Sequence, residues 1–451
     1  MSTNATATGT GPEPLGEPSR GEPHLLLVAG IGGHSAEEAL DSLRHVTGTV
    51  SVVYVAAWVG PEAVRADWAG RGLRGEFLAV DGLDEAVEVA VALHERLPLD
   101  GVVTYSELLL RPQTEIAHRL GLPGNTPESV VIAQSKAEQR RVFAEAGVPS
   151  PRFAVISGTG AGAGELAAAA DVTGLPAVFK PSLGAGSSGV QLVNDLEELE
   201  RVYKQAAAAD SPFLQRDEAF LLEERMPVES DGDSDYAAYV SVESLIVEGT
   251  AHHLVVTDRL RLRHGYMEEG LVLPSRLDTE AQGGIVDCAD RAVRAVGLTS
   301  GAVHTEIALT PDGPRAIEVN ARAGGPVPSL LETAAGYDYA AQIGRAALGV
   351  PPDQEFVMER AAWHRFIPIP QGTWRITAQA DKEDVLARFP GLVYLAPRFR
   401  PGQEVSRDRT LHLASFMLGA GTLDEARATA QAVERALGVE LDPADIHAET
   451  T

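Results

Sequence analysis

The stretch His304–Gly325, HTEIALTPDGPRAIEVNARAGG, predicts a β-hairpin with an acidic face. Two strands on either side of the central Pro-Asp-Gly turn would place Glu306 directly opposite Glu318. Side chains alternate between the faces of a strand, so Glu318 and Asn320 share one face, and Asn320 lies opposite His304. This face therefore gathers two carboxylates and an amide.

The opposed acids of this hairpin predict a metal site. Like charges directly opposite each other destabilise a sheet, which favours a divalent cation between them. Three hard oxygen ligands suit Mg²⁺, which usually keeps several waters and is shared with substrate phosphates. We therefore predict ligation by Glu306, Glu318 and Asn320. The alternative is a solvated hairpin face, which the apolar residues alternating with the acids, such as Ile307 and Val319, disfavour.

Length and charge narrow the class of protein. A chain of 451 residues exceeds one ordinary core, so about two to four domains are expected. The formal charge of -27 and the pI of about 4.8 argue against nucleic acid or an anionic membrane as a partner, since either needs a basic stripe. Any polyphosphate ligand must then be met by local basic groups.

Cysteine content and apolar runs indicate the cytoplasm. A single cysteine, Cys288, excludes an intrachain disulfide and fits a reducing compartment. Apolar runs such as VVYVAAWV fall short of the roughly 18 residues of a membrane span, and no signal peptide is recognised. Residues 1–23, rich in Thr, Gly, Pro and Glu, are predicted to be a disordered tail.

Residues 24–125 are predicted to form a doubly wound α/β domain. Apolar strands such as HLLLVA alternate with helical segments such as LDEAVEVAVALHERL, which favours a parallel sheet. Ligands of such sheets bind beyond the C-terminal strand ends, where Glu107 is predicted to lie. The glycines of Gly30–Gly33 lack the spacing of a dinucleotide fingerprint and predict a tight turn instead.

The segment Lys180–Gly189, KPSLGAGSSG, has the composition of a phosphate-binding loop. Glycines let the backbone approach closely, and successive amides and hydroxyls can donate to phosphate oxygens. It is not a Walker A loop, because no Gly-Lys-Ser/Thr follows. Lys136 lies in the first turn of a helix capped by Ser135, where the helix dipole disfavours a cation, and a phosphate would explain its presence. A solvent-facing lysine is the common alternative.

Two acids at the end of a strand are candidates for nucleotide recognition. Glu223 and Glu224 close FLLEE, and they could accept from an adenine amino group or from ribose hydroxyls. The backbone near Arg225 and Met226 would then read the base edge. Solvated surface acids are the alternative.

Together these motifs resemble the ATP-grasp superfamily, most closely its carboxylate-amine ligases of the L-amino-acid ligase (dipeptide synthetase) type. The resemblance runs from about His24 to the C-terminus, on VVTYSE, GLPGN, SKAEQRRVFAEAGVPSPR, VFKPSLGAGSSGV, LLEERM, YVSVESLIVEG, EEGLVLPS and the hairpin. It implies an α/β and α+β fold: a pre-ATP-grasp domain with a doubly wound parallel sheet (24–125), an ATP-grasp domain with a catalytic mixed sheet (126–355, lid about 150–225) and a small C-terminal α/β lobe (356–451).

The resemblance also implies roles for individual residues. Contacts with ATP fall to Lys136, Lys180, Ser182, Gly184, Gly186, Ser187, Ser188, Gly189, Glu223, Glu224, Arg225 and Met226. Contacts with substrate fall to Glu107, Glu268, Arg276, Arg322, Gly324 and Gly325. The implied catalytic residues are Lys180, which would contact the ATP phosphates, and Arg322, which would contact the transferred phosphoryl group and the substrate carboxylate. The metal ligands Glu306, Glu318 and Asn320 would hold two Mg²⁺ ions, with Mn²⁺ able to substitute.

Two positions depart from the family's pattern. Many amino-acid ligases read roughly Ile-Gly-His after the acid that matches Glu268, whereas this chain has Glu269-Gly270-Leu271. Tyr239 stands where relatives often have a ribose-binding acid. We expect the nucleotide function to survive both changes, but the substrates cannot be carried over.

The implied reaction is ATP-dependent formation of an amide bond. A substrate carboxylate would attack the γ-phosphorus to give an acylphosphate and ADP, and an amine would then displace phosphate. The partners would be a small-molecule carboxylate and a small-molecule amine, with a homodimer as one possible assembly. The alternatives are an ATP-grasp carboxylase, a ligase that loads a carrier protein and a non-catalytic nucleotide-binding regulator. The sequence leaves open both substrates, which of them is phosphorylated, and the pathway.

Overall fold

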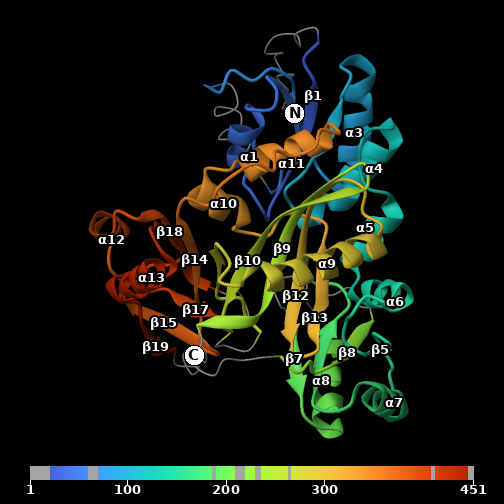
Figure 1. The fold of residues 1–451 in the computed structure, drawn as a ribbon, viewed down its shortest axis with the longest axis vertical. Coiled ribbons are helices and arrows are strands. Elements are labelled where there is room, and N and C mark those ends of the chain that lie inside the picture. Colours follow the sequence, from blue (N-terminus) through green and yellow to red (C-terminus); the bar gives the residue numbers. More distant parts are fainter. Residues whose placement is uncertain are drawn as a thin grey trace, which may run out of the picture.

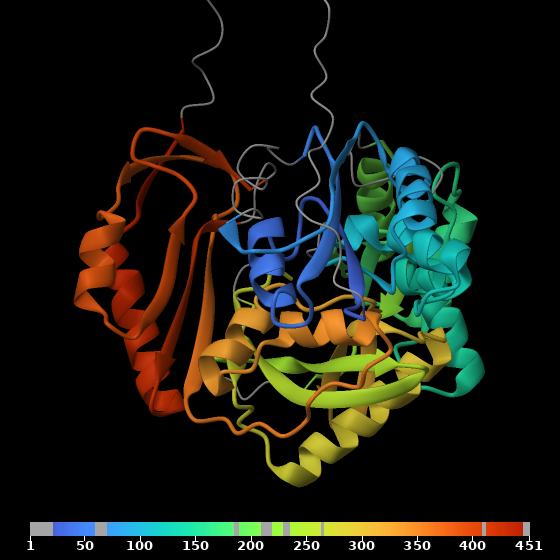
Figure 2. The same cartoon turned by 90° about the horizontal axis from the view of Figure 1, so that it is seen from above.

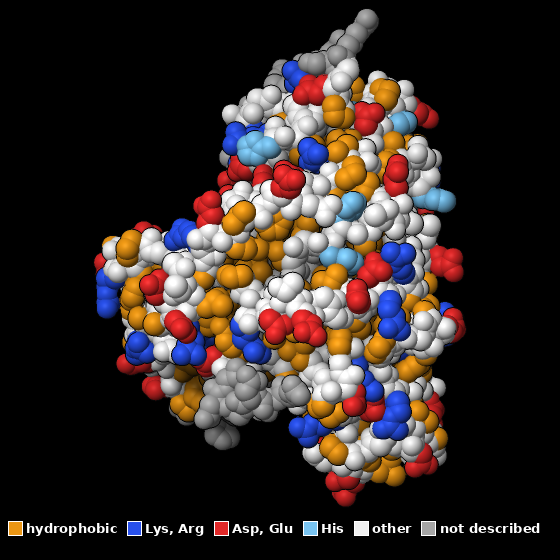
Figure 3. Space-filling view, in the orientation of Figure 1, with side chains coloured by type: hydrophobic (Ala, Val, Ile, Leu, Met, Phe, Trp, Pro, Cys, Tyr) orange, Lys and Arg blue, Asp and Glu red, His pale blue; other side chains and the backbone are white. Residues whose placement is uncertain are grey.

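The computed structural model describes residues 21–58, 70–184, 189–208, 219–228, 235–262, 266–407 and 412–444. The predicted tail lies outside these ranges except for residues 21–23. No helix within them combines the length and apolarity that a bilayer crossing requires. On the face drawn in Figure 3, Lys and Arg are interspersed with Asp and Glu and form no continuous basic stripe.

The N-terminal part of the chain, coloured blue in Figure 1, contains a four-stranded parallel sheet. Its strand order is β3-β2-β1-β4. Strands β1 and β2 are buried along their whole length, as expected for the apolar strands of a parallel sheet. The elements are β1 (His24–Ala29), α1 (Ala36–Leu43), β2 (Thr49–Val55), β3 (Phe77–Val80), α3 (Leu83–Arg96), β4 (Gly101–Val103), the 3₁₀-helix η1 (Glu107–Leu109) and α4 (Leu110–Leu120).

The centre of the molecule is an antiparallel sheet of eight strands in the order β13-β12-β9-β10-β11-β14-β18-β16. Helix α9 packs on one face, and α10 and α11 pack on the other. The elements before the C-terminal part are β9 (Tyr236–Val247), β10 (Thr250–Leu260), β11 (Gly270–Leu273), α9 (Thr279–Val296), β12 (Gly301–Thr310), β13 (Gly313–Asn320), α10 (Val327–Ala335) and α11 (Tyr339–Ala347).

A separate four-stranded antiparallel sheet, β5-β8-β6-β7, lies beyond the hairpin edge of the central sheet (Figure 1). Helices α7 and α8 pack against it through a core of their own. The elements of this region and of the two helices before it are α5 (Pro127–Gln134), α6 (Lys136–Ala146), β5 (Phe153–Ile156), α7 (Ala163–Thr173), β6 (Ala177–Pro181), β7 (Gln191–Val193), α8 (Leu196–Ala208) and β8 (Phe220–Glu224).

The C-terminal part lies on the opposite side of the molecule from this separate sheet (Figure 2). Three of its strands complete the central sheet, and three others form the small sheet β17-β15-β19. Helix α13 packs against β14 and β18 through a shared apolar core. The elements are β14 (Ala361–Pro368), β15 (Thr373–Ala378), α12 (Lys382–Arg388), β16 (Leu392–Pro397), β17 (Glu404–Ser406), β18 (His412–Ala420), α13 (Leu423–Leu437) and β19 (Glu440–Pro443).

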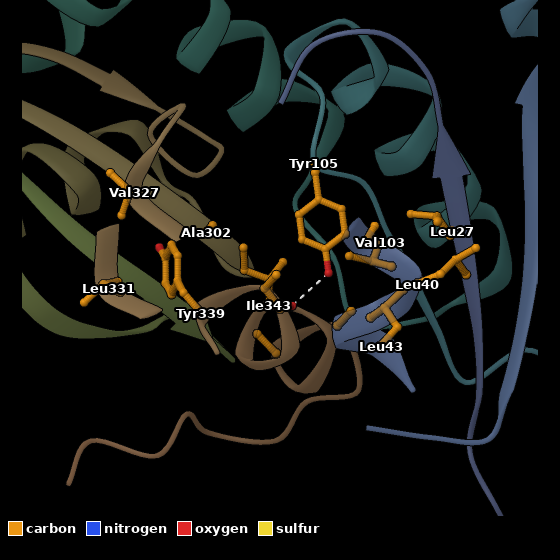
Figure 4. Packing of buried hydrophobic residues seen from close by; sticks show 14 of the residues in the cluster. Leu27, Leu40, Leu43, Val103, Tyr105, Ala302, Val327, Leu331, Tyr339 and Ile343 are labelled. Atoms are coloured by element: carbon orange, nitrogen blue, oxygen red, sulfur yellow. Dashed lines mark hydrogen bonds between the residues drawn. The ribbon is translucent and has the colours of Figure 1, made fainter. Parts of the chain in front are cut away.

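One apolar core joins the N-terminal sheet to the central sheet. Leu27 and Leu40 of the N-terminal part face Ile343 of α11 in this core (Figure 4). The hydroxyl of Tyr105 donates to the carbonyl of Ala340 at 2.8 Å, so it crosses the interface with its hydrogen bond satisfied. This contact also holds in place the start of η1, which carries Glu107.

The hairpin of β12 and β13 has the predicted pairing of acids but a different turn. Glu306 pairs with Glu318, and His304 pairs with Asn320. The register then shifts by one residue beyond Glu306, so β13 carries a β-bulge and the turn between the strands has two residues rather than the predicted three. The predicted symmetry about Asp312 is therefore wrong near the turn and right at the acids, because the bulge absorbs one residue.

Candidate active site

Lys136 contacts the hairpin from the first turn of α6. The helix is capped as predicted, with the Ser135 side chain accepting from the amide of Glu138. The Lys136 ammonium lies 2.9 Å from Glu318 Oε1 and donates to the carbonyl of Gly184 at 2.8 Å. The cation at this helix end is thus compensated by an acid of the hairpin and also contacts the start of the predicted phosphate loop.

A buried ionic cluster surrounds Lys180 at the end of β6. Its ammonium lies 2.8 Å from Glu223 Oε2, and Arg140 Nε lies 2.7 Å from Glu223 Oε1. Burial opposes ionisation of Glu223, but the two cations outweigh it and lower the pKa of this carboxyl. Arg140 also donates to the carbonyl of Ile317, the extra residue of the bulge, at 2.5 Å. Both Glu223 oxygens are therefore engaged here, so the predicted adenine contact stays a prediction.

The remaining residues of the predicted nucleotide site are spread around this cluster. Glu224 pairs with Arg152 and Arg315, at 2.6 and 2.8 Å, rather than with Lys180. Ser182 accepts from the amide of Lys136 through its carbonyl at 2.9 Å. The residues beyond the end of β8 are an exposed Arg225 and a half-buried Met226, and Gly189 adopts the left-handed conformation that the loop needs. Gly186, Ser187 and Ser188 lie outside the described residues.

A second ionic cluster is centred on Arg259 of β10. Its guanidinium lies 3.0 Å from Glu306 Oε1 and 2.9 Å from Glu268 Oε1, so it joins a predicted metal ligand to a predicted substrate acid. The ring of Tyr239 lies under the same guanidinium, 5.3 Å from it. In this structure Tyr239 therefore contacts Arg259 at the position where relatives often have an acid.

His304 adds a further charge next to Glu306. Its Nδ1 lies 2.8 Å from Glu243 Oε1, and its Nε2 lies 3.5 Å from Glu306 Oε1. Burial alone would lower the pKa of His304, but the Glu243 carboxylate outweighs it and raises this pKa to about 9. Burial would raise the pKa of Glu306, but the hydrogen bond from His304 and the charge of Arg259 lower it to about 2. Both groups are thus held ionised at neutral pH.

The donor set of the hairpin fits Mg²⁺ only in combination with substrate oxygens. No three His, Cys, Asp or Glu side chains in the described ranges are grouped to hold a metal by themselves. The ion pairs of Glu306 and Glu318 use Oε1 of each, so their Oε2 atoms and the amide oxygen of Asn320 are the hard donors for a cation. The protein's own cations offset the repulsion between the two acids, so this repulsion does not by itself require a metal.

The substrate residues predicted from the sequence fall into two groups, those that contact the ionic clusters, His304 or one another, and those that do not. Arg322 Nε lies 2.9 Å from Glu107 Oε2, which joins the end of the hairpin to the N-terminal domain. Gly324 packs so closely on His304 that an added Cβ would lie 2.6 Å from its Nδ1. Arg276, in contrast, donates its amide to Asp258 and lies over the ring of Tyr236. Gly325 is exposed with open space around it.

Three buried charges that the sequence did not single out complete these clusters. Arg140, Glu243 and Arg259 are between 0 and 4% exposed. Arg140 and Arg259 contact the predicted site residues Glu223 and Glu306, whereas Glu243 contacts His304, which was not predicted to belong to the site. Only Glu243 has a signal in the sequence, because it lies among the apolar and small residues of VSVES; Arg140 is flanked by Gln139 and Arg141, and Arg259 follows Asp258. A cavity of about 300 Å³ elsewhere, lined by residues such as Val255, contains none of the predicted site residues.

Comparison with known proteins finds an ATP-grasp domain in the chain. Residues 173–329 match the family model of the ATP-grasp domain. The chain is 31% identical over 251 residues to alanine–anticapsin ligase of Bacillus subtilis strain 168, a match that covers 54% of this chain and 52% of the relative. It is 30% identical over 339 residues to the uncharacterised protein y4rH of Sinorhizobium fredii, covering 74% of this chain and 67% of the relative.

A solved structure extends the likeness to the whole fold. The L-amino acid ligase from Bacillus licheniformis superposes with a TM-score of 0.70 and 19% identity, covering 94% of this chain and 99% of the other. The predicted combination of a parallel N-terminal sheet, a central sheet, a lid sheet (β5-β8-β6-β7) and a small C-terminal part is confirmed as a fold. The central sheet was predicted to be mixed, but its described strands pair only in antiparallel fashion, because hairpins such as β9–β10 and β12–β13 build it. The chain spans about half the length of the alanine–anticapsin ligase, so activity does not follow from sequence likeness alone.

Proposed function

Because this chain belongs to the ATP-grasp family, we propose that it is an ATP-dependent ligase that joins a small carboxylate, such as an amino acid, to an amine. Relatives named as ligases of amino acids support this reading over a carboxylase. The acids, lysines and arginine that the reaction needs are all present. A non-catalytic regulator would have no need of the complete set.

One observation carries the proposal: cations from two directions meet the acids of the hairpin. Lys136 reaches Glu318 from the side of the lid sheet, and Arg259 ties Glu306 to Glu268 on the other side. Arg322 extends from the hairpin to Glu107. A triphosphate bound beside the lysines would therefore lie next to a carboxylate bound beside the arginine.

The first chemical step would be attack of a carboxylate oxygen on the γ-phosphorus. The bond from this phosphorus to the β,γ-bridging oxygen breaks, and ADP leaves with that electron pair. Lys136 and Lys180 would neutralise phosphate charge, and Arg322 would orient the carboxylate, which are the positioning and electrostatic tasks that phosphoryl transfer sets. Mg²⁺ held by Glu306, Glu318 and Asn320 would supply further charge neutralisation.

The second step would be attack of an amine nitrogen on the acyl carbon of the acylphosphate. Phosphate leaves, and the nitrogen loses a proton as the amide forms. Glu107 and Glu268 are the acids that would bind an ammonium group before it is deprotonated. Their present partners, Arg322 and Arg259, hold them in position without ligand.

A phosphate-release screen tests the function. Amino acids and amines are supplied singly and in pairs with ATP and Mg²⁺, and products are identified by mass spectrometry. We expect release that depends on one carboxylate and one amine, with a product lighter than their sum by one water. Release that requires bicarbonate or a carrier protein instead would overturn the proposal. Repeating the active pair with Mn²⁺ and with increasing metal tests the proposed metal substitution and the two ions.

A further inference from the structure

The C-terminal part of the chain holds the acidic turn before β11 at several points. This turn contains Glu268, the substrate acid of the proposed function, and Glu269. His412 Nε2 of β18 lies 3.2 Å from the carbonyl oxygen of Glu268. The carbonyl of Glu269 accepts from the amide of Phe366 at 2.9 Å and from Arg365 Nη1 at 3.1 Å. The backbone of the turn is thus bonded to two neighbouring strands of the C-terminal part.

Gly270 brings the turn close to β14. It has φ +150°, a conformation that side chains rarely adopt, and an added Cβ would lie 2.1 Å from the carbonyl oxygen of His364. Beyond this glycine, β11 pairs in register with β14, Gly270 opposite Arg365 and Leu271 opposite His364. Any displacement of β14 is therefore passed to the residues just before Gly270.

Arg365 fixes the turn through a buried charge network. Its Nη1 lies 2.8 Å from Glu269 Oε2, and its Nε lies 2.6 Å from Glu434 Oε1 of α13. Glu269 is 0% exposed and Arg365 is 7% exposed, whereas the Glu434 side chain is 36% exposed. A buried carboxylate of this kind is tolerated because it is paired, so its ion pair with Arg365 contributes to keeping Glu269 in position.

The adjacent residue, Glu268, belongs to the second ionic cluster of the site. Its carboxylate pairs with Arg259, which also pairs with Glu306 of the hairpin. A continuous series of contacts therefore runs from α13 through Arg365 and the turn to the predicted metal ligands. We propose that Arg365 is a positioning residue of the proposed ligase reaction, which sets the place of Glu268 by holding Glu269 and its backbone. This assignment rests on the proposed function.

The test compares four variants in the full-length protein. Arg365→Ala removes the network, Arg365→Lys keeps the charge without the two-sided contact, and Glu269→Gln removes the buried charge while keeping a hydrogen-bonding side chain. Glu434→Gln weakens the solvent side of the network and is expected to leave the fold intact. The control is Arg427→Ala on the same helix α13, because Arg427 lines the same cavity of about 50 Å³ as Arg365 and pairs only distantly, at 3.6 Å, with Asp235.

KM and kcat are measured for ATP and for each substrate, with unfolding temperatures in parallel. We expect Arg365→Ala and Glu269→Gln to raise the KM of one substrate roughly tenfold or more, since small displacements of a binding group have effects of this size. The KM for ATP should stay within about twofold, and Arg365→Lys should recover part of the loss. Glu434→Gln should give a smaller change of the same kind, and Arg427→Ala none.

The outcomes separate the two proposals. If Arg365→Ala does not fold, the decision passes to Glu269→Gln and Glu434→Gln. Unchanged substrate KM in folded variants, or equal losses for ATP and substrate together with a lower unfolding temperature, would overturn the positioning role and leave the ligase function intact. A wild-type protein without carboxylate- and amine-dependent ADP release would instead refute the proposed function, and the positioning role with it.

Discussion

The two ionic clusters of the site differ in how completely they are closed. The side chains of Arg140, Lys180 and Glu223 are between 1 and 7% exposed, and every oxygen of the acid is paired. Around Arg259, which is 4% exposed, the Glu306 and Glu268 side chains are 22 and 32% exposed. The first cluster is therefore closed to solvent, whereas the second keeps acid groups within reach of a ligand. The following variants test whether this contrast separates stability from activity.

The largest effect is expected on the hairpin, next to the open cluster. Glu318→Gln should lower kcat by roughly 10²–10³-fold, because it removes the charge of a proposed metal ligand and the partner of Lys136. Unfolding should change little, since Glu318 is partly exposed. Steady-state kinetics with the active pair give the answer. Asp290→Asn, on the α9 face of the same sheet, is the control, and equal kcat in the two variants would contradict the metal assignment.

Breaking the closed cluster should affect stability instead. Arg140→Ala leaves Glu223 buried with only one cation and frees the carbonyl of Ile317, so we expect a loss of about 3 kcal/mol in the free energy of unfolding. Arg259→Ala should lose less stability and more activity, because water can reach the acids it pairs with. Denaturant unfolding measures the loss of stability in each variant, and steady-state kinetics measure the loss of activity. Equal stability losses in Arg140→Ala and Arg259→Ala would contradict the expected difference between the two clusters.

The pairing of His304 with Glu243 predicts how stability changes in alkali. The pKa of His304 is raised to about 9 in the folded protein, above its ordinary value. Its contribution is fully present below the unfolded pKa near 6.5 and is lost as the pH rises through 9. The free energy of unfolding should fall by roughly 3 kcal/mol between pH 6.5 and 10, a fall that His304→Gln removes. The difference between the two pH profiles, measured in urea, isolates this residue.

The smallest effect is expected at the contact between domains. Glu107→Ala should raise the KM of one substrate about tenfold and leave the KM for ATP unchanged, because it removes an acid but no phosphate contact. Glu115→Ala, on α4 of the same domain, is the matched control. A change in the KM for ATP alone would contradict the proposal that Glu107 binds a substrate.

The strand pairs could be predicted from the sequence where only the alternation of side chains along a strand was needed. It placed Glu306 opposite Glu318 and His304 opposite Asn320, because alternation along a strand depends only on local geometry. It missed the bulge at Ile317, whose extra residue is bonded by Arg140 from a distant helix.

Partners that come together only through tertiary folding could not be predicted. Nothing in the local sequence says that Arg259 will lie between Glu306 and Glu268, which are far apart along the chain. The C-terminal part is predicted from the sequence to be a small α/β lobe, yet its strand β14 joins the central sheet by pairing with β11, next to Glu268. Register between distant strands depends on the whole sheet, which no single segment encodes.

The central sheet joins the acidic hairpin at one edge to the C-terminal strands at the other. Hydrogen-bonded strands resist sliding past one another, so we expect the central sheet to be rigid. The hairpin of β12 and β13 and the C-terminal strands should then move together. During a catalytic cycle, the lid sheet would be the part that moves relative to the central sheet, because the two sheets share no strand.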